Sequence, residues 1–598
     1  MQETVYQAFS AVAQRLANRP ALLHKVAGRF QPITFAQLSQ AVDEVAAGLA
    51  EEGVKPGMRI GIYSYNRPEW VIADLAAIKL GAVVVPIYHT LPLDTVHYII
   101  NDAEVSHLFV ENPELFNPLL PFLEQLKSLK VVITFFEQET KTSAGKKILS
   151  LTALRAHGAS ALKEKPELAN PYQAKPDDLL TICYTSGTTG EPKGAMLSHK
   201  NILSNVFAAI ERFNVTENDL LVSFLPLCHM FERTCGYYTI LLAGAAIAYA
   251  ESLQTIRDDV ALVKPTILIV VPRVLEKVYN AVQEKVLTGP ALQRRLMIAT
   301  IRSANRYALL KSTKRKIPFT LALKKKILDL LVVRKLRKLG GGRIRLIVSG
   351  GAPLERKLAR TIRNLGFNLL EGYGLTETSP VVCAAVPGEE RVGTVGKPFP
   401  NVEVRIGAND EILVRGPNVM LGYYKKPEET ALAIDADGWF HTGDQGRFDA
   451  QGNLIITGRI KEIIVNAYGK NIPPVPIEHA LLCSKFIDQV TVIGDRRPYL
   501  VALIVPARLT LEDYARENKI PYQSYQELLE NPQVIKLFRE EIDRCLLPFA
   551  PYEQVRKFRL IPEPFTVENG LLTPTLKVRR KEIDRVFANL IEAMYQEK

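Results

Sequence analysis

The chain of 598 residues lacks several features that mark particular protein classes. Its six cysteines are scattered without a C-x-x-C pair, so neither a disulfide framework nor a zinc site is expected, and free thiols suit a reducing compartment. The first residues, MQETVYQAFSAVAQRL, contain no apolar signal core, so we do not expect export. The longest uncharged stretch near the middle, Thr234 to Ala250, is shorter than the roughly 20 residues of a membrane-spanning helix. We therefore expect a cytoplasmic protein without transmembrane segments, in which this stretch forms buried helix and strand.

Internal repeats and low-complexity segments are also missing. With 47% hydrophobic and 23% charged residues, the composition is that of an ordinary folded protein. The length exceeds the size at which a single core keeps growing, so several domains are expected.

Positive charge is concentrated in one segment. The net charge of +12 comes from 75 basic and 63 acidic residues, and residues 311–338 alone hold eleven basic residues against one acidic residue. Apolar residues recur there at helical spacing: Leu323, Ile327, Leu330 and Leu331. Two interpretations of this basic amphipathic segment stay open: a solvated face beside a core-packed helix, or peripheral contact with an anionic membrane surface on its inner face. Nucleic acid is not expected as a partner, because Phe319 is the only aromatic residue among these charges.

The order of apolar runs along the chain predicts the fold class. Up to about residue 380, valine- and isoleucine-rich runs such as RIGIYSYN, GAVVVPIY and IRLIVSGGAP alternate with helical patterns, which predicts parallel sheets covered on both faces. From about Val402, alternating polar and apolar residues around short turns predict hairpins of a small β-barrel or sheet. After Lys461 a further unit with its own strands and a closing helix is expected. We predict an α/β protein with an N-terminal domain of residues 1–460 and a C-terminal domain of residues 461–598.

A glycine-rich stretch, YTSGTTGEPKG (184–194), directly follows the apolar run LLTIC. Backbone N–H groups and hydroxyls in such a turn can surround a polyanion, and the lysine can neutralise it. The spacing is not that of a Walker A loop, because Pro192 precedes Lys193 and Gly194 follows it. The sequence therefore predicts a phosphate-binding loop of another kind.

Five further polar turns lie far apart in the chain: SGGAPL (349–354), EGYGLTET (371–378), HTGD (441–444), GRIKE (458–462) and LLTPTLKVRR (571–580). Each alone has an ordinary structural explanation, but their order and spacing argue against coincidence. Together with the glycine-rich stretch they resemble the adenylate-forming superfamily of acyl-CoA synthetases, adenylation domains and firefly luciferase over essentially the whole chain. A narrower likeness to long-chain fatty acyl-CoA synthetases is carried by LPLCHMFERTCGYY, VPRVLEKVYNAV and GLLTPTLKVRR.

The resemblance implies a fold and a reaction. The implied fold is a large N-terminal domain of two parallel-sheet α/β subdomains and a small β-barrel, followed by a smaller, mobile α+β domain. The implied reaction joins a long-chain fatty acid to AMP, with release of pyrophosphate from ATP, and then transfers the acyl group to coenzyme A; Mg²⁺ is the implied cofactor. An acyl–acyl-carrier-protein ligase and a non-catalytic membrane-associated binding protein are alternatives. Acyl chain length and oligomeric state stay open, with a homodimer as one option.

The resemblance also implies roles for individual residues in binding the nucleotide. The loop over the β- and γ-phosphates would comprise Thr185, Ser186, Gly187, Thr188, Thr189 and Lys193. The nucleotide pocket would be lined by Gly351, Ala352, Pro353, Glu371, Gly372, Tyr373 and Gly374, with the Tyr373 ring on adenine. Asp444 would accept hydrogen bonds from the ribose hydroxyls, with Arg459 approaching the same sugar.

A second set of implied roles concerns the chemistry. Thr376 would touch the α-phosphate, and Glu377 would hold Mg²⁺. His229 would lie beside the acyl carboxylate, and Lys577 would reach in from the C-terminal domain to the carboxylate and α-phosphate. Lys461 would be the hinge of that domain. Gly469 and Lys470 would contact coenzyme A, although this chain has IIVNAYGKN where many relatives have a lysine soon after the hinge.

Overall fold

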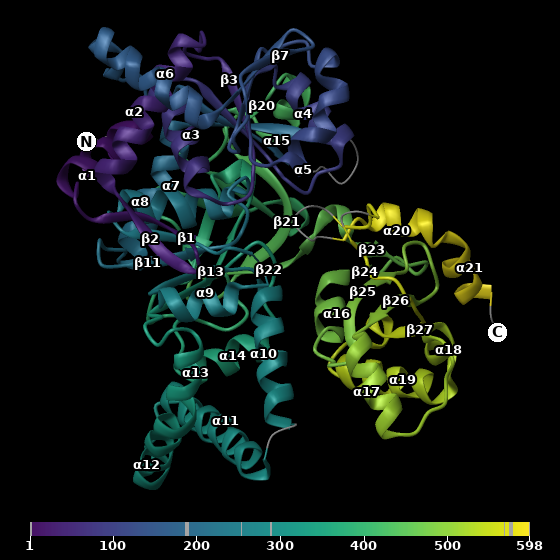
Figure 1. Cartoon of the computed structure of the whole chain (residues 1–598). Helices are drawn as coiled ribbons and strands as arrows, with labels where there is room; N and C mark the ends of the chain where they lie inside the picture. Colours follow the sequence, from purple (N-terminus) through teal and green to yellow (C-terminus); the bar gives the residue numbers. More distant parts are fainter. Residues whose placement is uncertain are drawn as a thin grey trace.

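The computed structural model of the chain describes residues 3–185, 191–252, 254–287, 290–566, 569–572 and 578–596, with the backbone alone at 283–287, 461 and 471. Figure 1 shows a large body formed by the N-terminal part, a smaller unit of C-terminal residues beside it, and a helical projection below the body.

The first of two nine-stranded sheets has the order β20-β10-β9-β4-β3-β5-β6-β8-β7. From β9 to β8 all neighbours are parallel, and the edge pairs are antiparallel. Its strands are β3 (Arg59–Tyr63), β4 (Val83–Ile87), β5 (Val105–Val110), β6 (Val131–Thr134), β7 (Lys141–Ser143), β8 (Lys146–Ser150), β9 (Leu179–Thr185), β10 (Lys193–Ser198) and β20 (Gly422–Tyr423). The helical segments around it are α2 (Phe35–Glu51), α3 (Pro68–Lys79), α4 (Leu93–Asp102), α5 (Pro113–Phe116), η1 (Asn117–Gln125), α6 (Leu151–Glu164), η2 (Pro166–Ala169) and α15 (Pro427–Ala433).

The second nine-stranded sheet has the order β17-β16-β15-β14-β13-β11-β12-β1-β2 and is parallel from β15 to β1. Its strands are β1 (Pro20–Val26), β2 (Arg29–Thr34), β11 (Leu220–Ser223), β12 (Ala246–Tyr249), β13 (Ile267–Val270), β14 (Leu346–Ser349), β15 (Leu369–Gly374), β16 (Val381–Ala384) and β17 (Lys397–Pro398). The helical segments that accompany it are α1 (Val5–Arg15), α7 (His199–Phe213), η3 (Phe231–Tyr238), α8 (Thr239–Leu242), α9 (Ile256–Val263), α14 (Arg356–Asn364) and η5 (Thr376–Thr378).

A smaller antiparallel sheet follows at the position where the sequence predicts a small β unit. It joins β18 (Glu403–Ile406), β19 (Glu411–Arg415), β21 (Phe440–Phe448) and β22 (Leu454–Arg459), with η6 (Ala408–Asp410) between the first two. Its strand order, β18-β19-β21-β22, is linear, so this unit is an open sheet rather than a closed barrel.

The C-terminal part has hydrophobic clusters of its own, made by residues between 464 and 594. Its sheets are β23 (Ile464–Val465) with β24 (Asn471–Ile472), and β25 (Ile487–Ile493) with β26 (Leu500–Pro506) and β27 (Val555–Leu560). Its helical segments are η7 (Ile460–Glu462), α16 (Pro474–Leu481), α17 (Arg508–Glu517), α18 (Tyr525–Glu530), α19 (Pro532–Leu546), η8 (Pro551–Glu553), α20 (Arg580–Val586) and α21 (Ala588–Gln596). The predicted α/β class with a smaller C-terminal domain is confirmed.

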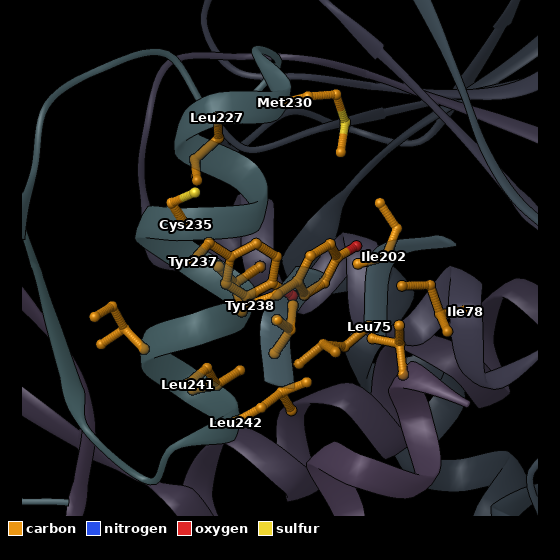
Figure 2. Packing of buried hydrophobic residues seen from close by; sticks show 14 of the residues in the cluster. Leu75, Ile78, Ile202, Leu227, Met230, Cys235, Tyr237, Tyr238, Leu241 and Leu242 are labelled. Carbon is orange, nitrogen blue, oxygen red and sulfur yellow. The ribbon is translucent and has the colours of Figure 1, made fainter. Parts of the chain in front are cut away.

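Helix α3 lies in the centre of the N-terminal core, in contact with strands of both large sheets. Eleven of its twelve residues are buried, and the two buried charges, Asp74 and Lys79, each form an ion pair. Figure 2 shows Leu75 and Ile78 of this helix beside Tyr237 and Tyr238 of η3 and Ile202 of α7. This packing fixes the segment that begins just after His229.

The basic segment forms an arm inserted between β13 and β14. After α10 (Pro272–Leu287), the chain continues through α11 (Ala291–Ser312), α12 (Phe319–Leu328), η4 (Asp329–Val333) and α13 (Arg334–Leu339). In Figure 1, α11 and α12 project from the body, away from both large sheets. The helical spacing of Leu323, Ile327, Leu330 and Leu331 agrees with α12 and η4, whereas residues 313–318 of the basic segment are not helical. Within the described ranges, no helix combines the length and the apolar run that crossing a bilayer requires.

Candidate functional site

A cavity of about 920 Å³ lies where the second large sheet, the small antiparallel sheet and the C-terminal domain meet. The carboxyl ends of β14 and β15 supply part of its wall, as expected for ligand sites of parallel sheets. The polar part of the wall includes Thr185, Lys193, His229, Gly350, Gly351, Gly372, Tyr373, Gly374, Thr376, Glu377, Glu411, His441, Arg459 and Glu462. Polar motifs that are hundreds of residues apart in the sequence thus meet at one cavity.

Two glycines in this wall allow the backbone to lie close to neighbouring groups. A side chain on Gly374 would place its Cβ 1.8 Å from the carbonyl oxygen of Pro380. A Cβ on Gly350 would lie 2.8 Å from the ring of Phe231. Larger residues at these positions would displace the strand end or the aromatic ring, which explains why small residues follow β14 and end β15.

Asp444 is buried directly behind the cavity wall, where it is the centre of a hydrogen-bonded group with the wall residues Tyr373 and Arg459. Its Oδ1 accepts a hydrogen bond from Arg459 Nε at 2.6 Å, and its Oδ2 accepts one from the Tyr373 hydroxyl at 2.7 Å. Asp444 and Arg459 face each other across the β21–β22 pair, so the sheet register brings them together. Burial, and then the nearby Asp444 carboxylate, raise the pKa of Tyr373 well above its ordinary value, so this hydroxyl stays protonated as a donor. Each carboxylate oxygen of Asp444 retains a further lone pair for a ligand hydroxyl.

Glu377 and Lys193 lie on another side of the cavity and share Tyr423 as a neighbour. The Tyr423 hydroxyl donates to Glu377 Oε1 at 3.0 Å, and Lys193 Nζ lies 5.2 Å from the centre of the Tyr423 ring. Thr185 pairs with Lys193 at the loop end of the antiparallel β9–β10 hairpin. The predicted phosphate-binding loop is the connection of this hairpin, and Ser186, Gly187, Thr188 and Thr189 lie outside the described residues.

The Glu377 carboxylate fits a divalent cation. Among the described residues, no cationic side chain forms an ion pair with it, and no group of three or more His, Cys, Asp or Glu residues encloses a metal position. A hard cation such as Mg²⁺ is bound in proteins through one or two carboxylates, with phosphate and water oxygens as its other ligands. One open carboxylate beside a cationic lysine at the phosphate end matches that donor set.

His229 lies in the cavity wall on the loop before η3. Its Nδ1 accepts a hydrogen bond from the Phe231 backbone N–H at 3.2 Å, and its ring meets the Tyr88 ring edge-on at 6.4 Å. The following η3 segment is a π-helix, a form that often occurs at functional sites.

A fully buried ion pair anchors the η3 segment. Arg233 pairs with Asp74 of α3 and donates to Thr181 Oγ1 of β9 at 2.7 Å. The hydroxyls of Tyr237 and Tyr238 donate to Asp74 Oδ2 at 3.0 and 2.8 Å. Because each charge has hydrogen-bond partners, the pair fixes the orientation of η3, and with it the loop that carries His229.

The other end of the cavity is apolar. Its lining comes from α7, η3, α8, β13, β14 and β16: Ala209, Phe213, Val215, Cys235, Ile240, Ile267, Ile269, Leu346, Val348, Val381 and Ala384. Ile267 and Ile269 alternate along β13, and Leu346 and Val348 along β14, so one face of these strands forms the wall. From Gly350 back to Leu346 the strand rises about 13 Å, which gives the depth of the apolar end along the sheet.

The C-terminal domain also reaches the cavity. Gly570, Leu572, Val578 and Arg579 are part of its wall, and Leu572 pairs with Val578 in an antiparallel bridge. Lys577 itself lies outside the described residues, but residues on both sides of it line the cavity. Of Lys461, the backbone is described, in the short segment η7 that joins β22 to the C-terminal domain.

Several predicted binding residues lie away from the cavity wall. Glu371 is buried and accepts a hydrogen bond from Arg363 of α14 at 3.0 Å. Burial raises the pKa of Glu371 to about 7, against the opposing influence of Arg363. Ala352 and Pro353 are exposed next to Gly351. Gly469 and Lys470 are exposed at the tip of the β23–β24 hairpin, where the Lys470 N–H donates to Asn466 Oδ1.

One polar pair at the cavity is absent from the sequence-based prediction. Glu411 Oε2 lies 3.0 Å from His441 Nδ1, and Glu411 Oε1 accepts a hydrogen bond from the Gly443 N–H at 3.0 Å. His441 belongs to the HTGD motif, which is a signal in the sequence. Glu411 carries no such signal, because it stands at the start of β19 and meets the motif only through the sheet.

Comparisons with known proteins agree with this arrangement. The sequence profile of the AMP-binding enzyme family matches residues 9–424, and the profile of the AMP-binding enzyme C-terminal domain matches residues 461–598. Human long-chain-fatty-acid–CoA ligase 1 is 34% identical over 99% of this chain and 86% of its own length. Long-chain-fatty-acid–CoA ligase FadD15 of Mycobacterium bovis is 35% identical over 95% of this chain and 93% of its own length.

Solved structures share the fold at lower sequence identity. The adenylation domain of a carboxylate reductase from Mycobacterium chelonae superimposes with a TM-score of 0.78 at 22% identity, covering 99% of this chain and 91% of that chain. The anthranilate–CoA ligase AuaEII, solved with anthranoyl-AMP, gives a TM-score of 0.73 at 20% identity over 99% of this chain and 98% of its own. The resemblance inferred from the motifs is confirmed: this chain belongs to the AMP-binding, adenylate-forming enzymes, in the branch of the long-chain-fatty-acid–CoA ligases.

Proposed function

We propose that this enzyme activates a long-chain fatty acid with ATP and transfers the acyl group to coenzyme A. The observation that carries the proposal is that a single cavity joins a polar end, with carboxylate, lysine, arginine and histidine side chains, to an apolar end between β13, β14 and α7. A nucleotide and an alkyl chain could therefore be held end to end, with the carboxyl group at their junction.

In the proposed complex the polar end binds the nucleotide. Asp444 accepts hydrogen bonds from the ribose hydroxyls while Arg459 and Tyr373 hold its carboxylate in place. Lys193 and Thr185, with the loop that they flank, bind the outer phosphates. Glu377 holds Mg²⁺, which would offset the negative charge that builds on the phosphate oxygens during the reaction.

The chemistry that we propose needs no nucleophilic side chain. A carboxylate oxygen of the fatty acid attacks the α-phosphorus, and pyrophosphate leaves. The thiol of coenzyme A then attacks the acyl carbon, and AMP leaves. His229 orients the carboxylate, while Thr376 and Lys577 donate hydrogen bonds where charge develops on the α-phosphate during the first step.

We also propose that the C-terminal domain, residues 461–598, moves relative to residues 1–460 between the two steps. Lys461 in η7 is the proposed hinge, because η7 is the short connection between β22 and that domain. The movement would withdraw Lys577 after adenylation and open a path for the thiol. In this second arrangement the β23–β24 tip, with Gly469 and Lys470, would contact coenzyme A.

We propose that the enzyme is located in the cytoplasm, in peripheral contact with the inner face of a membrane. The basic arm supports this part of the proposal, because its charge suits anionic headgroups. Fatty acids are also substrates that partition into bilayers.

The decisive experiment measures pyrophosphate release over a ladder of carboxylates from acetate to stearate. We expect release to depend on Mg²⁺ and to rise with chain length, and we expect acyl-CoA to form when coenzyme A is added. Parallel reactions with an acyl carrier protein test the alternative acceptor. An absence of acyl-AMP with every acid would refute the proposed function.

A further inference from the structure

The positive charge of the molecule is concentrated on the helical arm of residues 291–339. The arm holds fifteen basic residues and one acidic residue, and the rest of the chain has 60 basic and 62 acidic residues. Within the described part of the chain, one of these basic residues forms an ion pair, Lys325 with Asp329. Arg337 donates to the carbonyl oxygen of Gly366 and so joins the arm to the body. Most of this charge is therefore available to an external partner.

Exposed apolar side chains are concentrated on the same arm. Of the 25 large apolar side chains that are exposed among the described residues, nine lie in these 49 residues. Five of them recur at helical spacing (i, i+4, i+8, i+11 and i+12) along α12 and η4: Phe319, Leu323, Ile327, Leu330 and Leu331. Phe319 is 79% exposed and Leu330 is 60% exposed. This spacing places them on one face of the helix.

The exposed apolar face is separate from the face by which this segment packs on the rest of the protein. The opposite face of the same segment is packed, because Leu328 and Val333 are buried and α12 contacts α11. Lys325, which lies on that inner side, extends over the Tyr307 ring of α11 at 5.5 Å. The arm thus has an inner apolar contact and, separately, an outer apolar face.

Basic residues surround the outer face. Lys324 and Lys326 follow Leu323 on either side of the stripe. Lys314, Arg315 and Lys316 precede Phe319 in the connection between α11 and α12. All five are exposed. An apolar stripe with cations at its borders is the arrangement by which helices lie in the headgroup region of a bilayer.

We propose that the arm is a membrane-docking element, in which the outer face of α12 and η4 enters the interface of an anionic bilayer and the flanking lysines and arginines bind the headgroups. The proposal deepens the proposed function, since it names the surface by which the ligase reaches a lipid phase. Anionic lipid fits better than an acidic protein or a nucleic acid, because a stripe of five exposed apolar residues needs an apolar partner as well as a negative one.

A tryptophan reporter gives the direct test. The chain has two tryptophans, Trp70 and Trp439, and both are buried. In the full-length variant Phe319→Trp, the new indole should shift its emission to shorter wavelength when vesicles of phosphatidylcholine with about 30% phosphatidylglycerol are added. Vesicles of phosphatidylcholine alone should give little shift, and a Leu509→Trp variant in the C-terminal domain should give none.

Two sets of variants separate charge from insertion in a vesicle sedimentation assay. Lys314→Gln/Arg315→Gln/Lys316→Gln should weaken binding at least about tenfold at about 0.1 M salt. Phe319→Ser/Leu323→Ser/Ile327→Ser should weaken it by a similar factor and remove the binding that survives high salt. The matched controls are Lys519→Gln/Lys536→Gln/Arg556→Gln and Leu509→Ser/Leu547→Ser, which change exposed residues of the C-terminal domain.

The outcomes are distinct from those for the proposed function, because sedimentation uses no substrate. Melting temperatures and adenylation of a water-soluble fatty acid should be the same in the arm variants and the wild type. The inference is overturned if the wild type ignores anionic vesicles at low salt, or if arm and control variants lose binding equally. Retention on an immobilised acidic carrier protein without vesicle binding would overturn it in favour of a protein partner.

Discussion

At the residue scale, the site depends on side chains that are held by their neighbours before any ligand arrives. Asp444 has both carboxylate oxygens hydrogen-bonded, one to Arg459 and one to Tyr373. Its geometry is therefore set by two partners from different strands, which lowers the entropy that a ligand must remove.

The Asp444 group leads to the first prediction. Asp444→Asn should raise the KM for ATP and lower kcat/KM by about tenfold to a hundredfold, because it removes a charged acceptor. Tyr373→Phe should lower kcat/KM by less than about tenfold, because Arg459 still holds the Asp444 carboxylate. Steady-state kinetics over ATP concentration measure both, with Tyr595→Phe as a control far from the cavity. A KM for ATP unchanged in Asp444→Asn would contradict the role.

Lys577 gives the second prediction. Lys577→Ala should abolish adenylate formation from free acid, because the donor to the developing charge is lost. Thioester formation from supplied acyl-adenylate should be spared, since Lys577 has no role in that step of the proposed reaction. Assaying the half-reactions separately checks this. If both fell together in a folded variant, the assigned role would be wrong.

Glu232 illustrates a residue whose protonation affects stability rather than chemistry. Its side chain is fully buried in η3 and accepts a hydrogen bond from Ser223 Oγ at 2.6 Å. Burial raises the pKa of Glu232 to about 8 from an ordinary value of 4.5. Between these two pH values the folded state keeps a proton that the unfolded state releases. This residue's contribution to stability is therefore present at low pH and is lost as pH rises through the folded pKa.

The third prediction follows from this loss of stability as pH rises. Glu232→Gln replaces the protonated acid by a neutral side chain of similar shape, so the gain in stability of the variant over the wild type should grow with pH. The expected slope is up to about 1.4 kcal/mol per pH unit between the two pKa values. Melting temperatures at pH 5, 6.5 and 8 measure it, with Glu540→Gln as an exposed control. A difference that does not change with pH would argue against a proton held by Glu232.

At the scale of elements, the apolar end of the cavity is made by strands and helices that are themselves part of the core. Ala209 stands on α7 one turn before Phe213, and the facing wall is β14. A small residue at position 209 leaves the space open. The side chain at position 209 therefore limits the space that is open in the apolar end.

The fourth prediction concerns that helix. Ala209→Phe should fill the apolar end, lowering kcat/KM for palmitate by at least about tenfold while octanoate is affected much less. Ala209→Val should give a smaller shift in the same direction. Phe207→Ala, at an exposed position on α7, is the control. Equal loss with both acids would show that the alkyl chain does not occupy this end.

At the scale of the whole molecule, the cavity is closed by contacts between the two domains. Arg273 of α10 forms an ion pair with Asp488 of β25, and its Nη2 also donates to the Asp488 carbonyl oxygen at 2.9 Å. Residues on both sides of Lys577 reach the cavity in this arrangement. This arrangement is the one in which we propose that adenylation takes place.

The fifth prediction tests movement between the domains. Lys461→Pro should spare adenylation and impair thioester formation, because proline restricts the backbone angle at the proposed hinge. Lys461→Ala, which changes the side chain alone, is the control. Pyrophosphate release and acyl-CoA formation, measured in parallel, separate the two steps. Unchanged overall turnover in Lys461→Pro would refute the hinge.

Patterns that are local in the sequence were enough to predict the fold class and to identify the motifs. Alternating valine-rich runs and helical patterns predict parallel sheets because hydrophobic periodicity is a local property. Gly351 and Glu377, which follow β14 and β15, line one cavity because the carboxyl ends of neighbouring parallel strands lie at the same edge of a sheet. Lys193 and Arg459 reach the same cavity from antiparallel strands, which this rule does not predict. The basic arm was also evident, since charge and helical spacing are counted along the chain.

Which neighbouring side chains complete the site depends on how distant elements pack, and local patterns do not reveal it. Glu371 belongs to a predicted motif, yet it does not line the cavity. Its carboxylate accepts a hydrogen bond from Arg363 of α14, the helix that packs on its strand. Glu411 has no local signal, yet sheet pairing brings it to His441. Such partners depend on the packing of elements distant in sequence, and local periodicity contains no information about that packing.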